Sequence, residues 1–146
     1  GYGKTKLAQG QAWGVAVHES FDSVVAYVVV AEMRNGSPRL VSATAGVHCN
    51  FAVNPLTVAA QVEGAALMGL GITLKDGEVE QSNFHQYMVA RLTDMPAISV
   101  HVVSSGDAPT GMGEPGLPPL APAYANALFA LTGKRQRALP FEVTQA

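Results

Sequence analysis

The stretch Val24-Val25-Ala26-Tyr27-Val28-Val29-Val30 decides the fold, because a run of β-branched and aromatic residues this long is typical of a buried strand. It lies within an apolar segment that extends from Ser23 to Met33. Asn35-Gly36 follows, and this dipeptide favours a tight hairpin turn. We therefore expect Arg39–Val47 to return as the antiparallel partner. On the other side, the alternating residues Trp13–His18 predict a further strand.

A helix is predicted directly after this hairpin. Asn54-Pro55 combines a favoured N-cap residue with proline at the first helical position, and the apolar residues from Leu56 to Leu70 continue it. The helix is apolar on nearly all sides, which predicts burial on most of its surface. Gly64 and Gly69 each cost about 1 kcal/mol in a helix interior. Such glycines are tolerated where another group packs against the helix backbone.

The second half of the chain carries weaker signals. We expect a hairpin over Ile72–Ser82 that turns at Asp76-Gly77, then a strand over Ile98–Val103. A helix is predicted over Leu120–Leu131, where Gly133 and the cations that follow are typical of a C-terminal end. Strand, hairpin, helix, hairpin, strand and helix in this order predict an α+β fold, a largely antiparallel sheet with two main helices on one face.

Composition limits the functions that this chain can have. It has 146 residues, and only 14% of them are charged, against roughly 25% in an average soluble protein. We therefore expect part of the surface to be covered by more polypeptide, another subunit or a large cofactor. A net charge of −2 argues against binding of nucleic acid or an anionic membrane, and no apolar run in the sequence is taken for a transmembrane segment.

Cysteine and histidine give little sign of a metal site. Cys49 is the single cysteine, so neither an internal disulfide nor a multi-cysteine metal site can form, and the bacterial cytoplasm and periplasm both remain compatible. Of the four histidines, His18 and His101 lie in predicted strands and are interpreted as structural or surface residues. His48 beside Cys49 would need distant ligands. No protein ligand to a metal is assigned directly.

One acid stands out, in the stretch Gly111-Met112-Gly113-Glu114-Pro115-Gly116-Leu117-Pro118-Pro119. Glycine lets the backbone approach a ligand closely, and proline fixes the turn. Glu114 is therefore a candidate general base, although an ordinary solvated loop acid has the same local sequence. Glu63 could face it. We take Glu114 as the best acid and the helix from Asn54 to Leu70 as the best ligand wall.

The residues from Gly113 to Ala127 make a wider resemblance specific. They resemble the C-terminal part of the molybdopterin-binding subunit of the xanthine dehydrogenase/aldehyde oxidase family, and the isoquinoline 1-oxidoreductase β-subunit type in particular. Further matching segments occur in order along almost the whole chain: Gly14–Phe21, Ala52–Pro55, Gln61–Ala65, Glu80–His85 and Thr132–Arg135.

The resemblance implies a role for Glu114. In this family the Glu of Gly-Glu-Pro is the active-site base beside molybdenum, in enzymes that oxidise N-heterocycles or aldehydes with water as the oxygen source. A base must come within hydrogen-bonding reach of the group it deprotonates, and glycine next to Glu114 leaves room for that approach. Electrons then leave through iron–sulfur clusters on a partner subunit.

The resemblance also implies cofactor contacts, with departures from the family pattern. The cofactor would be molybdenum-molybdopterin, in its cytosine dinucleotide form, and the expected contacts are Gly113, Met68 and Gly69. Relatives have a glutamine where this chain has Met68, and methionine cannot donate a hydrogen bond. His48-Cys49-Asn50 replaces the usual Asp-Cys-Gly, and Gly71 leads into Ile72 with fewer residues than the family has there.

Family subunits are several times longer than this chain. We therefore expect residues 1–146 to be a single domain or a fragment, the C-terminal molybdopterin-binding region, which holds no molybdenum and is inactive alone. Its expected partners are the rest of that subunit, a [2Fe–2S] subunit, and a small heterocycle or aldehyde substrate. Two alternatives remain open, namely a non-catalytic orphan or assembly domain with the family fold, and an unrelated α+β domain that binds a small molecule.

Overall fold

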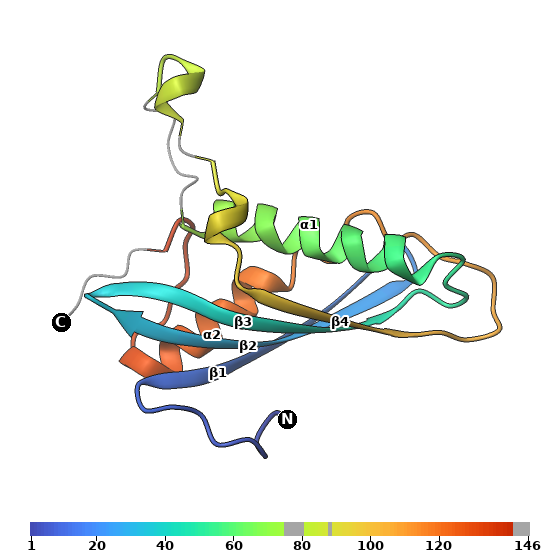
Figure 1. Ribbon diagram of the computed structural model, residues 1–146, viewed down its shortest axis with the longest axis horizontal. Helices are drawn as coiled ribbons and strands as arrows, with labels where there is room; N and C mark the ends of the chain where they lie inside the picture. The colour runs from blue at the N-terminus through green and yellow to red at the C-terminus, as the bar shows by residue number, and fades with distance from the viewer. Residues whose placement is uncertain (75–80, 88, 142–146) are drawn as a thin grey trace.

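The computed structural model describes residues 1–74, 81–87 and 89–141. Four strands form one sheet in the order β1-β2-β3-β4, and two helices complete the fold (Figure 1). The elements follow one another as β1 (Gln11–Ser20), β2 (Ser23–Arg34), β3 (Ser37–His48), α1 (Pro55–Leu74), β4 (Ala97–Val103) and α2 (Leu120–Thr132), with short 3₁₀ turns η1 (Phe84–Gln86) and η2 (Leu92–Asp94) before β4. The predicted α+β class is confirmed.

The first three strands form an antiparallel meander, as their sequence predicts. Tyr27 of β2 pairs with Ala16 of β1 and with Ala45 of β3, at the centre of the sheet. Asn35 and Gly36 make the turn between β2 and β3 with φ values of 51° and 80°, which Asn and Gly adopt more readily than other residues. The Asn-Gly turn therefore sets the register of this hairpin.

The fourth strand pairs in parallel with β3, so the sheet is mixed at this edge. Parallel neighbours need a long crossover, and the chain between β3 and β4 contains α1. Asn54 caps this helix, because its side-chain oxygen accepts from the backbone N–H groups of Leu56 and Thr57 at 3.1 and 3.3 Å. The predicted start of the helix is confirmed.

The hairpin predicted for Ile72–Ser82 is wrong at its described ends. Ile72 to Leu74 continue α1, and Gln81 and Ser82 are not in a strand, whereas the predicted turn at Asp76-Gly77 lies outside the described residues. The helix continues because Thr73 is buried and its hydroxyl donates to the carbonyl of Gly69 at 2.6 Å. Burial on the sheet thus outweighs the β propensity of the sequence Ile-Thr-Leu.

Both helices pack on the same face of the sheet. Alternate residues of β2 and β3 point toward them, and these residues are buried together with the inner sides of the two helices. The opposite face of the sheet carries residues such as Val17, which is 68% exposed. By length and mean hydropathy α1 could also cross a membrane, and it packs on this domain through Val62, Ala66 and Leu70. Only five residues of α1 are buried, so the predicted burial on most of its surface is wrong within the described residues.

Helix α2 lies directly on β1 at Gly14. A Cβ atom at this position would stand 1.9 Å from the carbonyl oxygen of Ala123 and 2.5 Å from the backbone nitrogen of Ala127. The side chain of Asn126 also donates to the carbonyl of Val15 at 3.0 Å. Any residue larger than glycine at position 14 must therefore push the helix away from the sheet.

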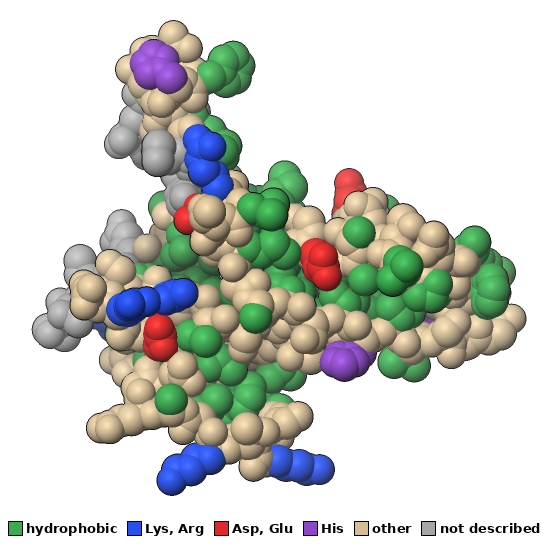
Figure 2. All heavy atoms as spheres, in the orientation of Figure 1, with side chains coloured by type: hydrophobic (Ala, Val, Ile, Leu, Met, Phe, Trp, Pro, Cys, Tyr) green, Lys and Arg blue, Asp and Glu red, His purple; other side chains and the backbone are tan. Residues whose placement is uncertain are grey.

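The surface carries few charges and much apolar area. Figure 2 shows isolated acidic and basic side chains with hydrophobic side chains between them. Several large apolar residues are more than half exposed, namely Val17, Phe21, Phe51, Val53, Leu56, Met68, Phe84, Leu92 and Val103. This is the surface expected of a domain that packs against further polypeptide.

We expect Gly14→Ala to lower the free energy of unfolding by about 3 kcal/mol or more, because the new methyl group would overlap the backbone of α2. Gly46→Ala is the matched control in strand β3, since a Cβ there meets nothing within 4 Å. Urea unfolding of the two variants measures the difference. Equal stabilities would contradict the close packing of α2 on β1.

Two buried tyrosines provide a second comparison. The Tyr27 hydroxyl donates to the carbonyl of Val62 at 3.3 Å, whereas the Tyr124 hydroxyl is buried without a hydrogen-bond partner among the described residues. We expect Tyr27→Phe to lower the free energy of unfolding by about 1 kcal/mol and Tyr124→Phe to leave it unchanged or raise it. Thermal unfolding followed by circular dichroism measures which of the two variants loses more stability. A larger loss for Tyr124→Phe than for Tyr27→Phe would contradict the prediction.

The same tyrosines predict a loss of stability in alkali. Burial raises the pKa of Tyr27 and of Tyr124 above the ordinary value of 10.0. The unfolded chain ionises at about pH 10 and the folded chain only at higher pH, so stability is full below pH 10 and falls above it. We expect the double variant with Phe at both positions to lose less stability between pH 9 and pH 11 than the unsubstituted chain, as urea titrations would measure. An identical loss in both would show that other groups cause the fall.

Candidate active site

The loop that carries Glu114 is fastened to two turns of the sheet. The backbone N–H of Thr110 donates to the carbonyl of Cys49 at 3.3 Å, and that of Gly111 donates to the carbonyl of Phe21 at 3.2 Å. The hydroxyls of Thr110 and Ser23 share a hydrogen bond of 2.7 Å. These bonds hold the loop at the end of the sheet where β1 passes into β2.

Gly116 brings this loop against helix α1. A Cβ atom on Gly116 would lie 3.2 Å from the Cβ of Ala65, 3.3 Å from the Cα of Val62 and 3.5 Å from the hydroxyl oxygen of Tyr27. A side chain here would press on the helix backbone, and glycine avoids this contact. Pro115 beside it is also buried. The seating of these two residues places Glu114, one position earlier, beside the helix.

Glu114 lines a cavity of about 550 Å³ between the loop, α1 and the end of β1. This volume is within the range of small-molecule sites. Eleven residues from these elements line the cavity: His18, Ser20, Phe21, Gln61, Gly64, Ala65, Met68, Gly113, Glu114, Leu117 and Pro118. The predicted acid and the predicted ligand wall therefore share one site. An unrelated α+β domain would be favoured by a Glu114 far from this helix, whereas the two line the same cavity.

The carboxylate of Glu114 is available to a ligand. The residue is exposed, and within the described ranges its side chain has no hydrogen-bond or ion-pair partner. Met68 on the opposite wall is 62% exposed. A carboxylate in this setting can accept a proton or a hydrogen bond from a molecule in the cavity without first breaking an internal contact.

The other predicted site residues are divided between lining and packing positions. Gly113 and Met68 line the cavity with Glu114, whereas Gly69 does not. Gly69 is buried, and a Cβ there would stand 3.1 Å from Cδ2 of Leu120, so this glycine admits α2. Glu63, the acid that could have faced Glu114, is not a lining residue. The cofactor contacts assigned to Gly113, Met68 and Gly69 remain predictions.

Three polar lining residues, His18, Ser20 and Gln61, were not identified from the sequence as site residues. His18 was interpreted as structural or surface, but it lines the cavity with Glu114. The alternation of side chains along β1 could have identified His18. Gly14, Ala16 and His18 occupy the same face of the strand, and Gly14 contacts α2. Gln61 belongs to the helix positions 61, 64, 65 and 68, whose spacing places them on one side of α1.

The described residues offer few metal ligands in this region, since His18 and Glu114 are the only His, Cys, Asp or Glu side chains among those that line the cavity. Residues 1–74, 81–87 and 89–141 contain no group of three or more His, Cys, Asp or Glu side chains placed to hold a metal ion. Cys49 is buried, and its carbonyl holds the Glu114 loop. Any metal in the cavity would therefore be brought by a cofactor or by ligands outside the described residues.

Comparisons with known proteins find relatives along most of the chain. No family model matches it. It is 32% identical over 152 aligned residues, 95% of this chain, to a protein of Gluconacetobacter polyoxogenes named membrane-bound aldehyde dehydrogenase (pyrroloquinoline-quinone). It is 35% identical over 100 residues, 64% of this chain, to isoquinoline 1-oxidoreductase subunit beta of Brevundimonas diminuta. The chain spans 20% and 13% of the lengths of these two relatives.

Solved structures share the fold. Quinoline 2-oxidoreductase from Pseudomonas putida 86 matches with a TM-score of 0.71 over 81% of this chain and 17% of its own, at 18% identity. The Cu,Mo-CO dehydrogenase matches with a TM-score of 0.66 over 76% of this chain and 16% of its own, at 16% identity. The four strands and two helices therefore form a unit that recurs inside much larger chains.

Proposed function

We infer from these similarities that this chain is a homologue of one part of the large subunits of the xanthine dehydrogenase/aldehyde oxidase family, and we propose that it supplies one wall and the base of a molybdenum hydroxylase active site. The observation that carries the proposal is the cavity in which Glu114 faces a wall of helix α1. The relatives include an aldehyde dehydrogenase and an isoquinoline oxidoreductase. We therefore propose aldehydes or N-heterocycles as the substrate class.

Glu114 is proposed to act as a general base. Hydroxylation replaces a C–H bond of the substrate by a C–O bond with oxygen from water, and it releases two electrons and two protons. Glu114 accepts one of these protons, from the water that supplies the oxygen. Its exposed carboxylate without internal partners supports this role, because a base must be free to contact the group that it deprotonates.

The cavity fits a bound cofactor in one respect. Gly64 and Gly113 line it, and a Cβ atom on either residue would meet nothing within 4 Å. The space beside both glycines is therefore open to a ligand. Gly64, Gly113 and Met68 would lie against the cofactor. When bound, a molybdenum cofactor would supply two-electron acceptance and activation of water.

The identity of the cofactor and the partners are part of the proposal. One structural neighbour described above is named as a molybdenum enzyme, whereas one sequence relative is named for pyrroloquinoline quinone. We propose molybdenum-molybdopterin in its cytosine dinucleotide form, which the resemblance to the isoquinoline 1-oxidoreductase type implies. The remainder of the large subunit and a [2Fe–2S] subunit complete the proposed enzyme, because this chain spans 20% or less of the two relatives described above.

We expect Glu114→Gln in the complete enzyme to lower turnover by about 10²–10⁴-fold, because the amide cannot accept the proton. Cofactor content should not change. Glu63→Gln is the control, since it removes an acid from α1 that does not line the cavity. Turnover of an aldehyde and of an N-heterocycle is measured on both variants, together with molybdenum and cytidine nucleotide content.

The outcomes separate the proposals. Loss of turnover with full molybdenum content supports Glu114 as the base. Unchanged turnover removes that role. An enzyme that contains quinone and no molybdenum overturns the cofactor assignment. A complex that assembles through this chain without any turnover would favour the alternative, a non-catalytic assembly domain.

A further inference from the structure

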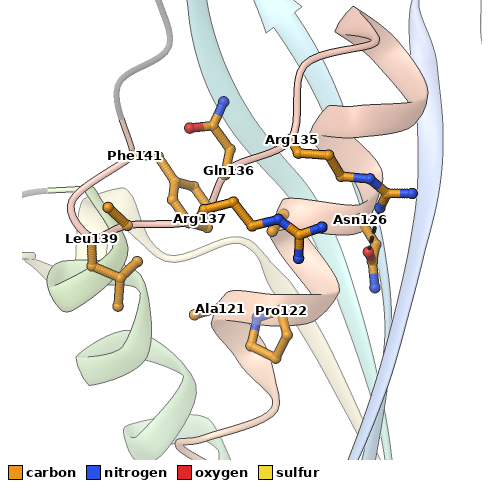
Figure 3. Close-up of a pocket in the computed structure, with 10 residues that line it drawn as sticks. Ala121, Pro122, Asn126, Arg135, Gln136, Arg137, Leu139 and Phe141 are labelled. Atoms are coloured by element: carbon orange, nitrogen blue, oxygen red, sulfur yellow. Dashed lines mark hydrogen bonds between the residues drawn. The ribbon is translucent and has the colours of Figure 1, made fainter.

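A second cavity, of about 340 Å³, lies between α2 and the segment that follows it (Figure 3). It shares no lining residue with the cavity of Glu114. Its walls come from the first half of α2 and from residues 135–141. The lining residues are Ala121, Pro122, Ala125, Asn126, Arg135, Gln136, Arg137, Ala138, Leu139 and Phe141. The proposed function above assigns nothing to this place.

Two arginines approach the cavity from the segment after α2, and Figure 3 shows both side chains reaching back across the helix. Arg135 is held in place, because its guanidinium carbon lies 3.5 Å from the ring centroid of Phe129 and its Nη1 donates to Oδ1 of Asn126 at 3.5 Å. Arg137 has neither a hydrogen bond nor an ion pair within the described part of the chain. Two guanidinium groups therefore line the cavity, and no Asp or Glu is present among the described residues that line it.

Apart from Asn126 and Gln136, the other lining residues are apolar. Ala121, Pro122 and Ala125 form the helix side, and Leu139 and Phe141 face them from the other segment. The Phe141 ring packs against the ring of the buried Tyr124, with 5.9 Å between the two ring centroids. The backbone N–H of Phe141 donates to the carbonyl of Thr73 at 2.8 Å, which ties this wall to α1.

We propose that this cavity binds a small organic carboxylate with an apolar body. The planar fork of a guanidinium matches a carboxylate in two parallel hydrogen bonds, and Arg137 has no partner among residues 1–74, 81–87 and 89–141 that would compete for them. The apolar walls take the body of the ligand, which inorganic anions lack. The volume is at the lower end of the range for small-molecule sites, so the body is about the size of one aromatic ring.

Benzoate is the probe, with benzamide and acetate as matched comparisons. Benzamide keeps the ring without the charge, and acetate keeps the charge without the ring. Isothermal titration calorimetry with the 146-residue chain should show binding of benzoate at least about tenfold tighter than of either comparison. Inorganic phosphate tests for a general anion site. Equal or tighter binding of phosphate or acetate overturns the proposal, as does an absence of benzoate binding.

Substitutions test whether benzoate binds at a defined site or is attracted only by the general positive charge of this segment. Arg137→Gln should weaken benzoate at least about tenfold, and Arg137→Lys should restore only part of the loss, because lysine cannot form the fork. Lys134→Gln removes an exposed cation that does not line the cavity and should leave benzoate binding within about twofold. An equal loss for Lys134→Gln and Arg137→Gln overturns the proposal.

A third variant tests the apolar wall with both arginines in place. Ala125→Leu fills the cavity, and benzoate should then bind at least about tenfold more weakly. Circular dichroism checks that this variant folds; Arg137 is exposed, so its substitution provides the test if Ala125→Leu does not. Tight binding of benzoate to folded Ala125→Leu overturns the proposed location.

Discussion

The contact of Tyr27, Val62 and Gly116 is the constraint on which the rest of the structure depends. Tyr27 stands on the central strand, its hydroxyl donates to the carbonyl of Val62 in α1, and Gly116 of the Glu114 loop closes over both. Sheet, helix and loop therefore meet at one buried point. Because interiors are packed without spare volume, a shift of any one of the three moves the others. The position of Glu114 relative to the helix follows from this contact more than from the loop's own sequence.

The topology explains why the Glu114 cavity draws on distant parts of the chain. The crossover through α1 makes β4 run parallel to β3, so both strands end at the same edge of the sheet. The loop after β4 then returns to the turn between β1 and β2, where the backbone of Gly111 bonds to Phe21. His18, Gln61 and Glu114 are brought together in this way. The helix supplies one wall and the end of β1 another, and both are rigid elements.

The surface of this unit has the composition expected where a domain packs against further polypeptide. Few side chains are charged, and large apolar residues such as Phe51, Val53 and Leu56 are exposed on one end of the fold. The chain spans about a fifth or less of the lengths of its relatives. In the proposed enzyme, other parts of the large subunit would complete the Glu114 cavity. The arginine cavity is lined by α2 and by residues 135–141 of this chain.

The sequence by itself determined the strands β1 to β4, both helix starts and the α+β class, because these depend on local periodicity, capping and turn residues. It made Glu114 a candidate base through the resemblance to a family, and that role stays a prediction. It did not determine that Ile72–Leu74 are helical, since their burial on the sheet outweighs local β propensity. It also did not show that His18 and Gln61 join Glu114, that Gly69 packs against Leu120, or that two arginines share an apolar cavity. Only the tertiary structure decided these points, because each depends on contacts between segments that are far apart in the chain, and short-range patterns carry no information about such distances.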